Sequence, residues 1–169
     1  PEDSSQTIPK VPWEWLKKYG IEISEILENR ICWSEQRKEL IFPVFSSQDG
    51  SLLMYQSRTF GNDKNHPKYL TIGKISNTLY ILNKKRSPEF PQYVCICEDL
   101  ISAIKISRLL HCVPLFGSIV SNDLLDKLSL LYLDLIIWLD PDKYHTYPKL
   151  IARASVYFDK KVTVIVAEK

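Results

Sequence analysis

The sequence predicts an α/β fold (α+β overall): a C-terminal parallel sheet flanked by helices, preceded by a small mixed α+β subdomain rich in antiparallel strands. Two observations predict it. Residues 39–60 contain two β-prone runs joined by a polar turn, and from Tyr93 onward short apolar runs alternate with helical patterns. Such alternation is typical of a parallel sheet with right-handed crossovers. We therefore expect an N-terminal helical and β-hairpin subdomain over residues 1–90 and a second domain over residues 91–169.

The N-terminal subdomain is expected to begin with two short helices. Residues 1–11 are polar with two prolines and predict a loose leader. Residues 12–20 start with Pro, carry Lys near their end and finish with Gly, which are helix start and stop signals. A second short helix is expected over residues 24–30.

Strands follow these helices. Residues 39–45 are apolar and β-prone, and the Asp49-Gly50 dipeptide favours a hairpin turn into a second strand over residues 52–60. Residues 69–72 and 78–82 are expected to form further short strands or turns.

The C-terminal part repeats an order of strand and helix. Tyr93–Cys97 is a continuous apolar run, as in a strand buried on both faces. The expected strands are residues 93–97, 113–116, 134–139 and 162–167, and the expected helices are residues 100–110, 121–132 and 147–157.

Composition limits the function classes. Apolar residues make up 45% and charged residues 25% of the 169 residues, which excludes a disordered tail, a collagen-like fibre and a disulfide miniprotein. The net charge is only +2, so any basic surface must be local. The longest apolar stretch, residues 128–139, is broken by Asp134 and is shorter than the roughly 18 residues that span a bilayer. We expect no membrane partner and a cytoplasmic protein.

The cysteines support a reducing compartment. None of Cys32, Cys95, Cys97 and Cys112 forms a Cys-x-x-Cys pair, so we interpret all four as reduced and mostly buried, and expect no zinc site within this chain. The chain begins without Met and ends just after an apolar strand, and we expect it to be a piece of a longer protein.

Acidic residues follow two of the predicted parallel strands. Glu98 and Asp99 come directly after one strand, and Asp140-Pro141-Asp142 comes directly after another. The carboxyl ends of such strands meet at one edge of the sheet. Pro141 biases Asp140 towards an extended backbone, so we expect both aspartates on the same side of an extended segment. Carboxylates held together repel each other unless a cation lies between them, and Mg²⁺ is suited to that place.

Each acid also has a structural interpretation. Glu98 could stabilise a helix N-terminus, and Asp140 and Asp142 could be a turn residue and a helix cap. Their joint occurrence at two buried parallel strands favours the metal site.

These acids resemble motifs of the TOPRIM-containing RNA-polymerase core of DnaG-type and phage primases. In that family a strand runs into a Glu and then a helix, and a later strand ends in Asp-x-Asp, as at Glu98 and at Asp140 to Asp142. The strand between them ends in a glycine turn, matched by Gly117. Residues 91–169 would then be the TOPRIM domain.

The preceding section carries the family's upstream motifs in order: a strand with Phe-Pro, a hairpin, an arginine motif, Lys-Tyr-Leu and Leu-Tyr. They lie at residues 40–44, 49–50, 57–60, 67–70 and 78–82, so the resemblance covers about residues 30–169.

The chain departs from the family pattern at two glycines. Asp99 stands where a Gly normally follows the Glu, and the Gly expected shortly after Asp-x-Asp is absent from residues 143–146. Either the tighter turns are lost or Asp99 joins the metal site. The family's zinc-binding module is not in this sequence, so zinc is expected only in a missing upstream module.

The resemblance implies a DNA primase, a nucleotidyltransferase that makes short RNA primers from NTPs on a single-stranded DNA template. Glu98, Asp140 and Asp142 would be catalytic and hold Mg²⁺ or Mn²⁺, with Glu98 as metal ligand or general base. A replicative helicase or a fused helicase domain would be a partner, in a bacterial cytosol or a phage-infected host; a phage or mobile element is the expected source. The residues implied to contact DNA or nucleotide are Arg58, Lys68, Lys84, Lys85 and Arg86.

Alternatives remain open. Arg58 and Lys68 could be ordinary strand-edge charges, residues 84–86 a solvated connector, and His145 a surface residue rather than a phosphate contact. Trp33 and Trp138 are interpreted as core. The acids could instead serve another TOPRIM enzyme such as a nuclease, or the chain could be a non-catalytic module that binds DNA or a replication partner.

Overall fold

The computed structural model describes most of the chain, as two compact units, Pro1–Thr78 and Leu79–Lys169. Each unit is described by itself. Among the described residues, no helix has the length and apolar character needed to cross a bilayer. The described residues are 4–5, 7–46, 49–61, 67–73, 79–82, 92–117, 119–159 and 161–166.

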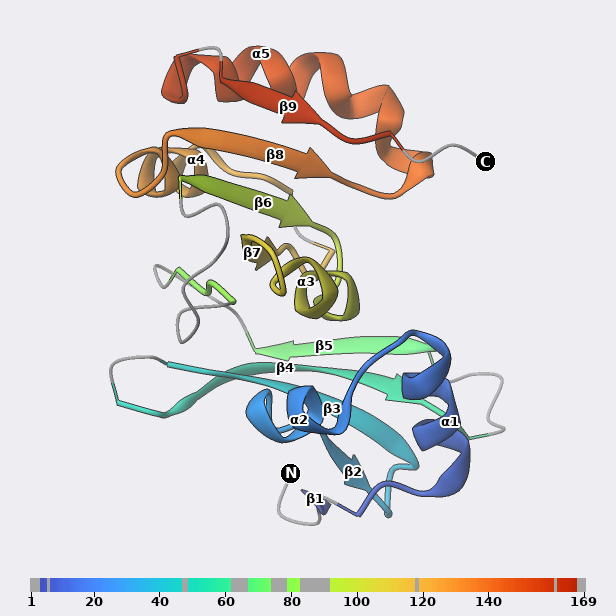
Figure 1. The fold of residues 1–169 in the computed structure, drawn as a ribbon. Coiled ribbons are helices and arrows are strands. Elements are labelled where there is room, and N and C mark those ends of the chain that lie inside the picture. The colour runs from blue at the N-terminus through green and yellow to red at the C-terminus, as the bar shows by residue number, and fades with distance from the viewer. Residues whose placement is uncertain are drawn as a thin grey trace. The chain divides into compact units, whose positions relative to one another are not determined.

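The first unit contains a five-stranded antiparallel sheet in the order β1-β2-β3-β4-β5 (Figure 1). The hairpin predicted at Asp49-Gly50 joins β3 to β4, with the Ser46 N–H donating to the Ser51 carbonyl at 2.8 Å. The elements are β1 (Ser4–Ser5), α1 (Lys10–Lys18), α2 (Ile23–Glu28), β2 (Cys32–Ser34), β3 (Glu39–Phe45), β4 (Leu52–Thr59) and β5 (Tyr69–Gly73).

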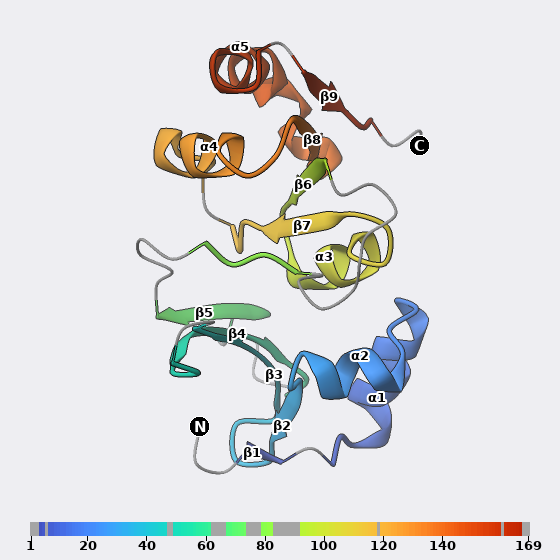
Figure 2. The ribbon, with the colours of Figure 1, turned by 60° about the vertical axis from the view of Figure 1, so that its left-hand side comes forward.

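The second unit contains a four-stranded parallel sheet in the order β7-β6-β8-β9. Figure 2 shows α3 on one side of this sheet and α4 and α5 on the other. The predicted fold class is therefore confirmed. The elements are β6 (Tyr93–Cys97), α3 (Leu100–Ile106), β7 (His111–Pro114), α4 (Asn122–Ser129), β8 (Asp134–Trp138), the 3-10 helix η1 (Pro141–Thr146), α5 (Tyr147–Tyr157) and β9 (Val162–Val164).

The core of the second unit lies between its sheet and α4 and α5. Alternate strand residues such as Val94, Ile96 and Ile137 face it, and Leu125 and Leu150 come from the helices. The opposite face carries Cys95, Cys97 and Cys112, all buried and free as predicted, with the Cys97 and Cys112 sulfurs 3.5 Å apart.

Two predictions on the N-terminal half of the chain need correction. Residues 1–11 do not form only a loose leader, because β1 pairs with β2 and α1 begins at Lys10. Pro12 still lies in the first turn of α1, where backbone N–H groups have no intrahelical partner. The short strand or turn expected over residues 78–82 is, within the described residues 79–82, only an isolated bridge between Leu82 and Cys112.

Trp33 is buried as predicted, at 4% exposure, but the prediction for Trp138 is wrong, because its exposure is 41%. Leu135 and Ile137 of β8 face the core with α4 and α5, and the alternate residues Asp134 and Trp138 face the other way. On that face α3 packs against β6 and β7 rather than β8, so Trp138 keeps solvent contact.

Candidate metal centre

The site begins with the register of two parallel strands. Cys97 of β6 pairs with Trp138 of β8, so the chain leaves both strands at the same edge, one residue before Glu98 and two residues before Asp140. From there the two connections run in opposite directions across the sheet, β6 towards β7 and β8 towards β9. Ligands of open α/β sheets bind in the crevice at such a switch point. The predicted proximity of the two strand ends is therefore present.

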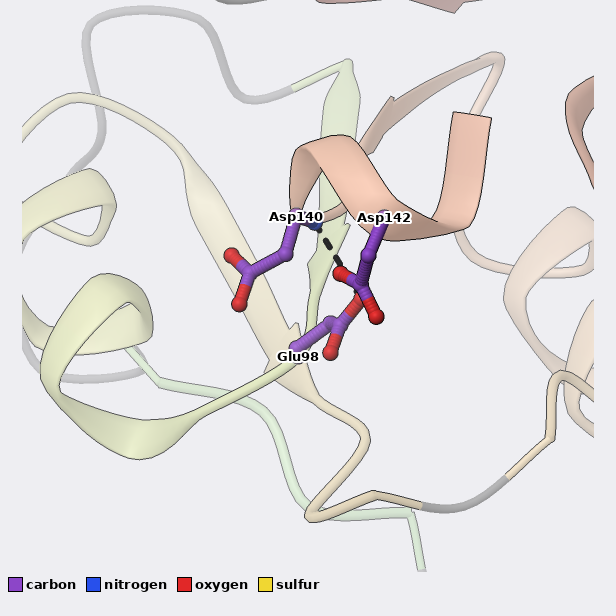
Figure 3. A group of neighbouring side chains, drawn as sticks. All are labelled: Glu98, Asp140 and Asp142. Atoms are coloured by element: carbon purple, nitrogen blue, oxygen red, sulfur yellow. Dashed lines mark hydrogen bonds between the residues drawn. The ribbon is translucent and has the colours of Figure 1, made fainter. Parts of the chain in front are cut away.

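Glu98 and Asp140 are tied together directly. The Asp140 N–H donates to Glu98 Oε1 at 3.1 Å, which Figure 3 marks with a dashed line. One oxygen from each of Glu98, Asp140 and Asp142 lies within 4.8 Å of the other two. The structure thus gathers the three acids that the sequence singled out.

The local backbone differs from the expectation. Asp140 is extended, with φ −63° and ψ 152°, as a residue before Pro should be. The extended segment ends there, because Pro141 starts the 3-10 helix η1 and Asp142 lies in its first turn. The helical turn, rather than a shared face of an extended chain, brings Asp142 towards Glu98.

The pKa values of Glu98 and Asp140 are raised, whereas that of Asp142 is lowered. Partial burial is the main cause of a raised pKa for Glu98 and for Asp140, and neighbouring carboxylates add to it in both cases. Asp142 behaves oppositely, because its hydrogen bond with Lys143, 3.0 Å away, lowers the pKa of this exposed carboxyl. Burial and like charge thus both disfavour the ionised forms of Glu98 and Asp140, and a bound cation would offset that cost.

Asp99 does not join this group. It is the N-cap of α3, with Oδ1 accepting from the Ser102 N–H at 2.9 Å and Oδ2 accepting from the Ser102 hydroxyl at 2.7 Å. The alternative that Asp99 is a metal ligand is therefore not supported. A capping residue at this position stabilises the helix start directly, which accounts for a non-glycine residue after Glu98.

The three acids fit a divalent cation such as Mg²⁺. Their carboxylate oxygens are hard ligands that lie close together, and three protein ligands leave the rest of the coordination shell open. Mg²⁺ characteristically takes one or two carboxylates, with water and phosphate completing its shell. Lys143 neutralises only part of their charge.

Tyr147 holds the strand end that precedes Asp140, a role that no sequence pattern indicated. Its hydroxyl accepts from the Leu139 N–H at 3.0 Å and lies 3.2 Å from the Ile165 carbonyl, to which it donates. Tyr147 is buried at 5% exposure. It therefore joins the chain segments that follow β8 and β9.

The predicted basic residues fall into two groups. Arg58 on β4 and Lys68, just before β5, lie in the first unit, where the Thr59 N–H donates to the Lys68 carbonyl at 3.0 Å. His145 lies on η1 and is exposed, as its surface interpretation requires. Lys84, Lys85 and Arg86 lie outside the described residues.

Arg58 sits among aromatic rings. Its guanidinium carbon is 4.4 Å from the Trp15 ring centroid, 5.1 Å from that of Tyr69 and 5.2 Å from that of Phe60, and it donates to the Tyr69 hydroxyl. Buried Arg58 Nε has no hydrogen-bond partner among the described residues. Trp15 of α1, whose ring also packs 4.7 Å from that of Tyr19 just after the helix, was not identified from the sequence as part of this group.

Comparison with known proteins identifies the fold. The chain superposes on an Aquifex aeolicus primase containing zinc-binding and RNA polymerase domains with a TM-score of 0.72 and 10% identity, covering 95% of this chain and 50% of that one. A DnaG primase catalytic domain bound to ssDNA gives 0.70 and 14%, over 94% and 64%. A DNA primase domain from Pseudomonas aeruginosa gives 0.54 and 19%, over 82% and 46%.

The likeness is one of fold. The chain spans about half to two thirds of the length of these solved structures. No protein-family model matches the chain, and neither does any curated protein sequence. At such low identity, the shared structure establishes a DnaG-type primase catalytic fold. The chemistry has to be argued from the residues of the site.

Proposed function

We propose that this chain is the catalytic core of a DNA primase, which makes short RNA primers from NTPs on single-stranded DNA. One observation carries the proposal: three carboxylates meet at the switch point of a parallel sheet, within a fold shared with DnaG-type primase domains. In this proposal residues 91–169 are the TOPRIM domain and residues 1–90 the N-terminal subdomain.

Glu98, Asp140 and Asp142 would hold Mg²⁺ or Mn²⁺. A bound divalent cation supplies Lewis-acid stabilisation of the charge that develops on a phosphate during nucleotidyl transfer. Glu98, whose Oε1 accepts the Asp140 N–H, would contact the cation or take the proton from the attacking 3′-hydroxyl. The raised pKa of Glu98 suits the general-base role, because a base works best when its pKa approaches the working pH.

Arg58 and Lys68 would contact the template in the first unit. Aromatic rings beside a cation suit single-stranded nucleic acid, because bases stack on rings while phosphates pair with the charge. Trp15, Tyr69 and Phe60 surround Arg58, and Tyr69 is 45% exposed. One structurally similar primase domain was solved bound to ssDNA, which agrees with this proposal. Lys84, Lys85 and Arg86 are proposed as further backbone contacts from their charge alone.

A primer-synthesis assay tests the function. The protein is incubated with single-stranded DNA, labelled NTPs and Mg²⁺ or Mn²⁺, beside its Glu98→Gln and Asp140→Asn variants. Asp123→Asn, an exposed acid on α4, is the matched control. We expect short RNA from the wild type and the control, and none from the two site variants.

The contrary results are distinct. No primers from a wild-type protein that still binds DNA would favour a non-catalytic binding module. Metal-dependent cleavage of the template, lost in the same two variants, would favour a nuclease.

A further inference from the structure

The second unit contains a cavity beside the metal centre that the proposed chemistry has not used. Its volume is about 400 Å³, within the range of small-molecule sites. It opens between the loop after β7, the end of β8, and η1 with α5. The lining comprises Glu98, Leu115, Gly117, Ile119, Val120, Leu139, Lys143, His145, Thr146, Lys149, Leu150 and Arg153.

One part of the lining is apolar. Leu115, Val120, Leu139 and Leu150 are each at most 8% exposed and belong to the core of the unit. Ile119 also lines the cavity but is 87% exposed. A flat apolar group could therefore lie on the buried leucines and valine and be covered on one side by Ile119.

The other part of the lining is cationic. Lys143 and His145 come from η1, and Lys149 and Arg153 lie four residues apart on one face of α5. Arg153 donates to the Val120 carbonyl, which holds its guanidinium against the loop. Three permanent cations and one histidine thus face a single acid, Glu98.

Glu98 connects the cavity to the metal centre. It lines the cavity and is one of the three gathered carboxylates, while Lys143 lines the cavity and pairs with Asp142 at 3.0 Å. A ligand in the cavity would therefore have one end next to the acids.

We propose that this cavity binds a nucleoside triphosphate, with its base on the apolar lining and its phosphates along Lys143, Lys149 and Arg153 towards Glu98. The proposal deepens the proposed function, on which its role in primer synthesis rests, by assigning residues to nucleotide binding. An apolar floor with a cationic rim matches a ligand with one flat apolar end and one polyanionic end. The contacts come from the chain itself, so binding should persist without a metal.

Equilibrium binding of ATP in EDTA tests the proposal on the whole chain, by calorimetry. Lys149→Glu reverses a rim charge, and Ile119→Asp places a charge at the apolar side; both residues are exposed, so both variants should fold. We expect each to weaken ATP binding about tenfold or more, the scale of one lost charge-assisted or apolar contact.

Matched controls separate the site from general charge effects. Lys105→Glu makes the same charge change on α3, across the sheet, and Val156→Asp makes the same apolar change on an 80% exposed residue of α5 outside the cavity. Both controls should bind ATP as the wild type does. Equal weakening in controls and cavity variants, or no ATP binding by the wild type, would overturn the proposal.

Two further arms separate this proposal from others. If inorganic triphosphate binds as tightly as ATP, and Ile119→Asp does not weaken the binding of either, the cavity is an anion site without a base-binding side. That result would overturn the proposal. Glu98→Gln should abolish primer synthesis, while metal-free ATP binding should be retained or strengthened, because the substitution removes the one negative charge that lines the cavity. A protein that binds ATP through Lys149 and Ile119 yet makes no primers would refute the proposed function and retain this site.

Discussion

The backbone N–H of Asp140 donates a hydrogen bond to the Glu98 side chain, at 3.1 Å across the carboxyl ends of β6 and β8. This contact spans 42 positions in the chain. It fixes one oxygen of Glu98 relative to the backbone of Asp140 before any cation binds. The charge and the position of Glu98 can therefore be tested separately.

Glu98→Gln removes the charge but keeps an oxygen that can accept the Asp140 N–H. We expect Mn²⁺ affinity to fall at least about tenfold, since even changes to supporting groups around metals cost about 10–100-fold. Calorimetric titration of Mn²⁺ measures this. Asp123→Asn, on α4, should bind Mn²⁺ as the wild type does. Unchanged affinity in Glu98→Gln would remove Glu98 from the metal site.

The free energy of unfolding of the metal-free protein should depend on pH through the same acids. The folded state raises the pKa of Glu98 and of Asp140, so between an ordinary carboxyl pKa of about 4 and the raised values it binds more protons than the unfolded state. These two acids therefore make stability fall as pH rises through that window. Asp142 acts oppositely: its lowered pKa gives stability that is lost as pH falls through the lowered value.

Asp140→Asn isolates this effect. We expect the variant in EDTA to be more stable than the wild type at neutral pH by about 0.5 kcal/mol, a small gain because solvent screens a partly exposed group. The difference should vanish at acidic pH, where the wild-type carboxyl is protonated. Urea unfolding at a series of pH values measures it. A variant less stable than the wild type at neutral pH would contradict the claim that the ionised Asp140 carboxylate destabilises the metal-free folded state.

Asp99 is expected to act on helix α3 rather than on a metal. Asp99→Ala removes the cap that accepts from Ser102 and should cost about 1 kcal/mol of unfolding free energy. Asp99→Ser retains a capping hydroxyl without the charge, so it should recover most of that loss and bind Mn²⁺ as the wild type does. Weaker Mn²⁺ binding in a stable Asp99→Ser variant would restore Asp99 to the metal site.

Much of this structure follows from local sequence signals. The strands over residues 39–45 and 93–97 and the helix over residues 147–157 were predicted with the bounds observed, because their apolar runs and helical spacing are uninterrupted. β1 and β2 were missed, since strands of two and three residues carry too little pattern to be recognised. Their pairing depends on β3, which lies far from β1 in the sequence.

The sequence likewise predicted some residues of the candidate site and missed others. Glu98, Asp140 and Asp142 could be found because each lies at or near the end of a predicted strand. The Arg58 surroundings could not, because Trp15 comes from a helix whose packing on the sheet has no sequence signature. Lys149 and Arg153 have a four-residue spacing, which places them on one face of a predicted helix. Only the structure shows that this face lines a cavity.

Lys68→Ala should weaken binding to single-stranded DNA and lower its salt dependence. A phosphate contact on a single strand contributes about 0.7 to the slope of log affinity against log salt, so the slope should fall by about that amount. Fluorescence anisotropy at several salt concentrations measures it. Lys10→Ala, whose side chain is 86% exposed on α1, is the charge-matched control. An equal slope in wild type and Lys68→Ala would remove Lys68 from the interface.

Trp15→Ala should also weaken binding to single-stranded DNA, for a different reason. The ring lies 4.4 Å from the Arg58 guanidinium, so its loss frees the cation to move and removes a surface on which a base can stack. We expect a loss of about 1–3 kcal/mol, the range for one stacked base, with little change in the salt slope. Arg58→Ala, in contrast, should lower both affinity and slope. A Trp15→Ala protein that is folded by circular dichroism and binds DNA normally would refute this role.

Tyr147→Phe tests whether the strand end before Asp140 is held by a single hydroxyl. The substitution leaves the backbone N–H of Leu139 without its acceptor at a buried position, which should cost about 1–3 kcal/mol of unfolding free energy. Because Asp140 is the next residue, its carboxylate should also lose its fixed position, and Mn²⁺ affinity should fall although no ligand has changed. Tyr157→Phe, at the other end of α5, is the matched control. A destabilised Tyr147→Phe protein with wild-type Mn²⁺ affinity would show that the hydroxyl stabilises the fold without positioning the site.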